Sequence, residues 1–282
     1  MTPGSQLAPE FVSHAAPQPV LVRAQQPALA LFAIGLVGLG ILALTYGDFA
    51  LVWQPVAAWV PGRTALAYGS GVLMLLLGVG LLFQATVAWS TRILFPYLIV
   101  WALLKVPAFF VAWRIEGVWL GFGELAMLLA GGWMLFARHA ALRDDSIFAF
   151  AYGDRGVRIA RYLFALWVIP VGLSHFIYFK ATDQLIPAWL PFHTGWAYLT
   201  GAGHIACGLA LLFSVLPRLA AYAEAGMIGI FTLLVWAPAI IAAPQQRLPW
   251  TAFFISWIIG AAALAVAQTV TPGKPERASF NA

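Results

Sequence analysis

Charged residues are scarce in this chain of 282 residues. Asp, Glu, Lys and Arg make up 9% of the sequence, whereas soluble domains carry about 25%. Apolar residues make up 62%, and 20 Phe and 13 Trp are among them. Only a lipid bilayer tolerates so much apolar surface outside a core. The composition therefore excludes a soluble globular enzyme and predicts a polytopic membrane protein.

Cysteine is almost absent, since Cys207 is the only one. One thiol excludes an intrachain disulfide, a thiol relay within the chain and an all-thiolate metal site or iron–sulfur cluster. The sequence also lacks phosphate-cradling and dinucleotide-binding motifs. The formal net charge of +5 bears on membrane orientation, so we expect no nucleic-acid partner.

Apolar runs of spanning length recur along the chain, because a transmembrane helix needs about 20 residues. The sequence predicts an all-α fold with eight transmembrane helices. They lie near residues 28–49, 64–86, 93–113, 118–137, 158–180, 194–215, 219–242 and 250–270. An even number of spans places both termini on one side of the membrane.

Two polar tails flank these spans. Residues 1–26 are rich in Pro, Gln and Ala and predict a disordered tail rather than a signal peptide; residues 271–282 form the other tail. The basic residues on the side of the tails are Arg23, Arg92, Arg138, Arg143, Arg155, Arg158, Arg161, Arg218, Lys274 and Arg277, and those on the opposite side are Arg63, Arg114, Lys180 and Arg247. The positive-inside rule then places both termini in the cytoplasm.

An internal repeat is the strongest pattern in the chain. A shift of 130 residues aligns 59–83 with 189–213, with ten identities in 25 positions and no gap. A four-helix unit therefore occurs twice, at 27–137 and at 158–270, and the basic residues 138–157 join the units on the cytoplasmic side. Because each unit has an even number of spans, both copies insert in the same direction.

Each unit also has a segment rich in Trp and Pro between its first two spans. These segments read AWVPGR at 58–63 and PAWLPFH at 187–193. Two interpretations stay open, namely aromatic anchors at the membrane interface and lids over a pocket inside each unit.

Four motifs of the second half have a recognisable pattern of small and aromatic residues. They are GLSHFIYF at 172–179, IPAWLP at 186–191, WAYLTGAGHIACGLALL at 196–212 and LLVWAPAIIAAPQQRLPWTAFF at 233–254. With them the chain resembles the DoxX-like family, small four-helix proteins of bacterial inner membranes. The first half departs from the pattern, with Thr45 and Met74 where the second has His175 and His204.

The resemblance implies an inner-membrane location and an accessory role beside a redox protein partner. The family name comes from subunits of a quinone-reducing thiosulfate oxidoreductase, so the implied ligand is a quinone. This remains an analogy at the level of the fold, and whether the chain has catalytic activity of its own stays open.

His175 and His204 are the main candidates for a ligand site. On antiparallel neighbouring helices their depths differ by about 8 Å, which argues against a shared zinc ion or a b-type haem. We expect them to hydrogen-bond a small hydrophobic ligand lined by Trp189, Tyr198 and Trp236. The alternative is that both are core histidines satisfied by neighbouring groups.

Lys105 and Glu124 are ionisable residues within predicted spans, where such groups are costly. Adjacent antiparallel helices bring them close, either as an ion pair that fixes helix register or as a proton relay in a small-solute transporter. Against transport, Pro107 and Pro238 are expected to kink their helices without breaking them. A scaffold without a ligand is the third hypothesis. Glu224 is expected to cap a helix near the cytoplasmic interface.

Overall fold

The computed structural model describes residues 26–141 and 148–270, and every secondary structure element in these ranges is a helix. Eight helical segments are long and apolar enough to cross a membrane. In the first half they are α1 (Pro27–Tyr46), α2 (Arg63–Leu81), α3 (Val87–Lys105) continued by α4 (Pro107–Ala112), and α5 (Glu116–His139). The predicted all-α polytopic fold is confirmed.

The second half repeats this order after the short 3₁₀ helix Ala149–Ala151. Its spans are α6 (Gly153–Ile177), α8 (His193–Leu212), α9 (Pro217–Phe231) continued by a π-helical turn (Thr232–Trp236) and α10 (Ala237–Ala242), and α11 (Arg247–Thr269). A short helix, α7 (Phe179–Leu185), follows α6. Local signals fix several boundaries, since Pro27 and Pro217 open α1 and α9, where the missing N–H costs nothing.

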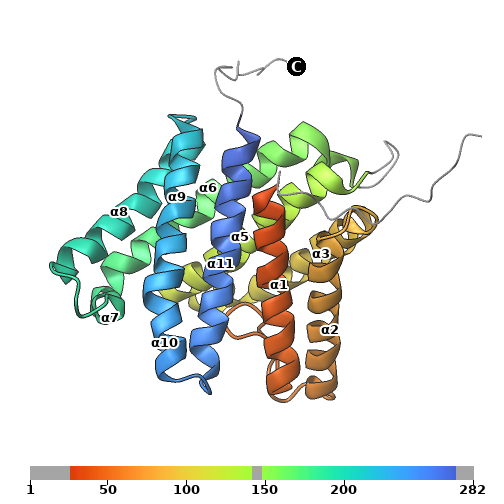
Figure 1. Cartoon of the computed structure of the whole chain (residues 1–282), viewed down its shortest axis with the longest axis horizontal. Coiled ribbons are helices and arrows are strands. Elements are labelled where there is room, and N and C mark those ends of the chain that lie inside the picture. The colour runs from red at the N-terminus through yellow and green to blue at the C-terminus, as the bar shows by residue number, and fades with distance from the viewer. Residues whose placement is uncertain (1–25, 142–147, 271–282) are drawn as a thin grey trace, which may run out of the picture.

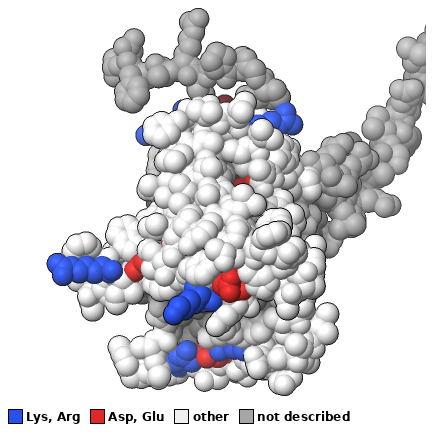
Figure 2. Space-filling view, turned by 90° about the vertical axis from the view of Figure 1, so that its left-hand side faces the viewer, with Lys and Arg blue, Asp and Glu red and all other residues white. Residues whose placement is uncertain are grey.

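The outer surface suits a lipid environment. Large apolar side chains such as Leu76, Leu103 and Ile230 are exposed on the helices. Figure 2 shows a side face on which charged residues are few and uncharged residues cover most of the area. Such a surface has no soluble counterpart, so the chain is a multi-pass membrane protein.

The two halves exchange helix contacts across the centre of the molecule. α1 packs against α2 and against α11, and α6 packs against α8 and against α5, while α5 and α11 touch each other. Figure 1 shows α11 beside α1, although the two are at opposite ends of the sequence. The indole Nε1 of Trp257 donates to the carbonyl of Leu31 at 2.8 Å across this contact. The first helix of each half is thus covered by the last helix of the other.

Close glycine contacts set the register within each half. A Cβ on Gly40 would lie 2.8 Å from the carbonyl oxygen of Gly71, and one on Gly172 would lie 2.6 Å from that of Gly201. The second helices of the two halves correspond at a shift of 130 residues, but these contacts relate the first helices at a shift of 132. Gly71 therefore meets Ala43 where Gly201 meets His175. Ala43, and not Thr45, occupies the place of His175 in the first half.

Both third spans are interrupted near a proline, contrary to the expectation of simple kinks. α3 ends at Lys105 and α4 starts at Pro107, whereas α9 passes into the π-helical turn before Pro238. A proline inside a helix lacks an N–H and clashes with the carbonyl four residues earlier. The wider π-helical turn accommodates this clash, and such turns are frequent at functional sites.

Candidate functional site

A histidine and a glutamate form a buried pair between α8 and α9. Nδ1 of His204 lies 2.6 Å from Oε1 of Glu224, and the two residues are only 3% and 1% exposed. The expectation that Glu224 caps a helix at the interface is wrong. It is seven residues past the start of α9, roughly 10 Å along the helix, and faces α8.

His175 joins this pair from α6. Its ring centroid lies 5.3 Å from that of His204, which is closer than the expected offset of about 8 Å. The close approach of α6 and α8 at Gly172 and Gly201 allows the two side chains to lean toward each other. Phe231 packs against both rings, with centroids 6.2 and 6.4 Å away.

The remaining hydrogen bonds leave part of this cluster open. Nδ1 of His175 lies 3.2 Å from the hydroxyl of Thr200, which also donates to carbonyls of its own helix. Oε2 of Glu224 is buried without a hydrogen-bond partner, and no described residue bonds to Nε2 of either histidine. The cluster can therefore hold a proton on the His204–Glu224 pair and still offer two ring nitrogens to a ligand.

The aromatic residues predicted to line a ligand lie at different places. Tyr198 stacks on Phe176 and Phe179, and Trp189 is 70% exposed in the segment between α7 and α8. Trp236 is half-buried at the end of the π-helical turn. The ring neighbours of the two histidines are each other and Phe231, a residue that the sequence did not single out.

Lys105 and Glu124 lie on adjacent segments of the first half without a direct contact. Nζ of Lys105 donates to the carbonyl of Gly121 at 2.5 Å. Among the residues that the structure describes, no ion pair within 4.0 Å joins Lys105 to Glu124. The lysine is thus satisfied by the backbone of α5.

The first half has a neutral polar cluster at the level of Thr200. Ser70, which aligns with Thr200, bonds to Gln54 and Tyr97, with distances of 2.9 and 2.7 Å, and Gln54 also donates to Tyr97 at 2.8 Å. Where the second half has the ionisable His204, the first has the buried Met74. The two halves therefore have different chemistry at the same depth.

An apolar cavity of about 470 Å³ adjoins this neutral cluster. Its lining includes Ser70, Trp101 and, from the segment between α1 and α2, Val56, Trp59 and Val60. Of the two interpretations of this segment, the lid describes its contacts in the first half, although Trp59 itself is 82% exposed.

The ends of the spans opposite the basic joint are tied together by one carboxylate. Asp48 accepts hydrogen bonds from Arg63 and from Arg247, the latter at 2.8 Å, and from the backbone N–H of Phe49 at 2.7 Å. Burial raises the pKa of Asp48, but these hydrogen bonds outweigh burial and lower it below 3.8. The cluster links the start of α11 to the end of α1.

Metal chemistry finds little support in the described ranges, which contain no group of three His, Cys, Asp or Glu side chains that could hold a metal ion. Cys207, one turn after His204, is buried.

Comparison with known proteins locates the second half in a family without an assigned role. A family model described as a domain of unknown function (DUF8561) matches residues 164–262. No curated protein and no solved structure matches the chain. The matched residues include His175, Thr200, His204 and Glu224, so the buried cluster lies within the part of the chain that the family shares.

Proposed function

We propose that this protein binds a small hydrophobic ligand with a polar head group in its second half. In this proposal it is a non-catalytic or accessory subunit of a redox-linked complex in a bacterial inner membrane. The observation that carries the proposal is the buried pair of His204 and Glu224, with the ring of His175 5.3 Å from that of His204. Three ionisable groups inside an apolar membrane protein are costly, which argues for a functional role.

The residues present fit a quinone head group. Its carbonyl oxygens would accept hydrogen bonds from Nε2 of His175 and His204, whose Nδ1 atoms are engaged elsewhere. A quinone supplies reversible uptake of electrons together with protons. Glu224 would hold the proton that the His204 ring releases or takes up, because its carboxylate already shares a hydrogen bond with that ring. Phe231 supplies an apolar wall that excludes water.

A copurification experiment tests this function. The full chain would be purified in mild detergent, and extracted small molecules would be identified by mass spectrometry. The variant His175→Ala/His204→Ala should lose the bound apolar molecule, whereas His193→Ala, which removes a histidine at the start of α8, should retain it. Unchanged ligand stoichiometry in the double variant would overturn the proposal, and absence of any ligand from the wild type would favour a scaffold.

A transporter is the second candidate, and the interrupted third spans favour it. Discontinuous helices in equivalent positions of two repeats are typical of transporter substrate sites. Lys105, at the end of α3 and directly before the break, would contact the solute or a proton carried through Glu124. Solute flux into proteoliposomes that Lys105→Met abolishes would support transport, and no flux over a broad solute panel would oppose it.

The orientation with both termini in the cytoplasm belongs to the same proposal. It rests on the excess of basic residues on the side of the tails. A redox protein partner would then dock on the basic cytoplasmic face. Reporter fusions to the two ends should both report cytoplasm, and a periplasmic signal from either would reverse the assignment.

A further inference from the structure

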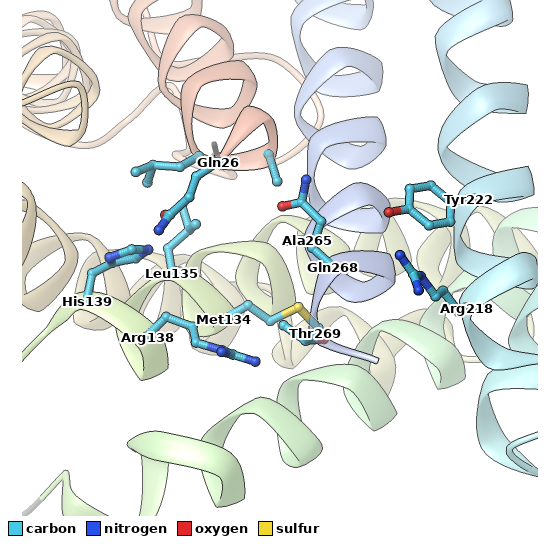
Figure 3. A pocket seen from close by; sticks show the side chains of 12 residues that line it. Gln26, Met134, Leu135, Arg138, His139, Arg218, Tyr222, Ala265, Gln268 and Thr269 are labelled. Carbon is cyan, nitrogen blue, oxygen red and sulfur yellow. The ribbon is translucent and has the colours of Figure 1, made fainter. Parts of the chain in front are cut away.

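A basic pocket lies where helices of both halves end. It has a volume of about 490 Å³ and is bounded by the first turns of α1 and α9 and the last turns of α5 and α11. Figure 3 shows the polar side chains of Gln26, Arg138, His139, Arg218, Tyr222 and Gln268 around a common space. This end of the molecule is the one proposed to face the cytoplasm.

The pocket concentrates positive charge without a counter-charge. No Asp or Glu is among its lining residues, and neither Arg138 nor Arg218 forms an ion pair within the part of the chain that the structure describes. Arg138 lies in the last turn of α5, where the helix dipole favours a cation. Arg218 lies in the first turn of α9, where the dipole opposes one.

The position of Arg218 therefore needs another explanation than helix stability. Its guanidinium lies over the ring of Tyr222, 5.7 Å from the centroid, which restricts its position at the pocket. A bound anion would neutralise both arginines and would also lie at the positive end of α1, whose first turn has no side-chain cap.

We infer that this pocket binds a phosphate-bearing anion. The planar fork of arginine matches the oxygens of a phosphate group, and the amide of Gln268 and the hydroxyl of Tyr222 add neutral donors from α11 and α9. An anionic phospholipid and free phosphate present the same chemistry to these groups. Basic pockets between transmembrane helices at this membrane face are typical sites for lipid head groups. The pocket shares no residue with the His204 cluster, so the inference is independent of the proposed function.

Native mass spectrometry of the full chain in mild detergent tests the site with phosphatidylglycerol and, as the uncharged comparison, phosphatidylcholine. The variant Arg138→Gln/Arg218→Gln removes both charges. The matched control Arg155→Gln/Arg158→Gln removes two charges from exposed positions on α6 at the same end of the molecule. Arg138→Lys/Arg218→Lys keeps the charge and serves if the glutamine variant does not fold.

We expect the wild type and the control to hold one phosphatidylglycerol in preference to phosphatidylcholine. The glutamine variant should bind it about tenfold more weakly, as expected for the loss of charge-assisted hydrogen bonds, and the lysine variant should fall between. In a second arm, inorganic phosphate is compared with chloride at equal ionic strength. Thermal stabilisation by phosphate in the wild type only, without lipid preference, would identify free phosphate as the ligand. Equal losses in the glutamine variant and the control, or no binding of either probe, would overturn the inference.

Discussion

His204 and Glu224 share a hydrogen bond of 2.6 Å in a setting that excludes water almost completely. Removal of one partner leaves the other buried and unpaired, which costs about 3 kcal/mol or more. Glu224→Ile and His204→Met alone should therefore each lower stability strongly. These substitutions introduce the residues of the first half at the aligned positions, Ile93 and Met74.

The double variant His204→Met/Glu224→Ile should be more stable than either single variant, because it leaves no unpaired polar group. Thermal unfolding in detergent measures all four proteins as a double-mutant cycle. Additive losses would show that the two side chains are not energetically coupled.

The contact between α6 and α8 predicts a position-specific effect of glycine replacement. A Cβ at Gly172 would meet the backbone oxygen of Gly201 at 2.6 Å, so Gly172→Ala should push the helices apart and lower stability by about 1–3 kcal/mol. It should also weaken ligand binding, because it moves His175 relative to His204. Gly229→Ala on α9, where a Cβ would meet nothing within 4 Å, is the control. Equal stability of both variants would contradict the close contact.

The ion cluster at Asp48 predicts a defined pH dependence. Because the folded state lowers the pKa of Asp48 below 3.8, its contribution to stability is complete above that pH and is lost as the pH falls through the folded value. Asp48→Asn should melt at a lower temperature than the wild type at pH 7, and the difference should shrink between about pH 5 and pH 3. Asp154→Asn, at an exposed position, should show no such convergence. A constant difference for Asp48→Asn would contradict the prediction.

The neutral cluster of the first half predicts a smaller loss. Tyr97→Phe removes the hydroxyl that accepts from Gln54 and pairs with Ser70, which should cost about 1–2 kcal/mol. Tyr68→Phe, on the half-exposed side of α2, provides the comparison in the same thermal assay. Similar losses from both would show that the cluster contributes nothing specific.

The sequence predicted the eight spans because each is an apolar run of bilayer length, and it predicted the repeat because small residues such as Gly71 and Gly201 recur at a fixed shift. It did not predict that Glu224 meets His204. Which face of α9 points at α8 depends on helix rotation, and the apolar run around Glu224 has no polar periodicity to fix it. A glutamate within an otherwise apolar run, seven residues past Pro217, was the signal that could have suggested a buried partner.

The shift between the two halves was also beyond the sequence. The alignment paired Thr45 with His175, whereas the glycine contacts pair Ala43 with it. A two-residue slip of one helix past another leaves composition and hydropathy unchanged, so only the packing shows it. The exchange of α1 and α6 between halves is hidden for the same reason, since every span has apolar residues that suit several neighbours.

This exchange sets the order in which the protein can be completed during synthesis. α11 is the last span to leave the ribosome, yet it covers α1, the first to enter the membrane. A nascent chain that stops before Arg247 would leave one side of α1 facing lipid or an insertion factor, and it would lack Arg247 as a partner for Asp48. The first half therefore reaches its final packing only when translation ends.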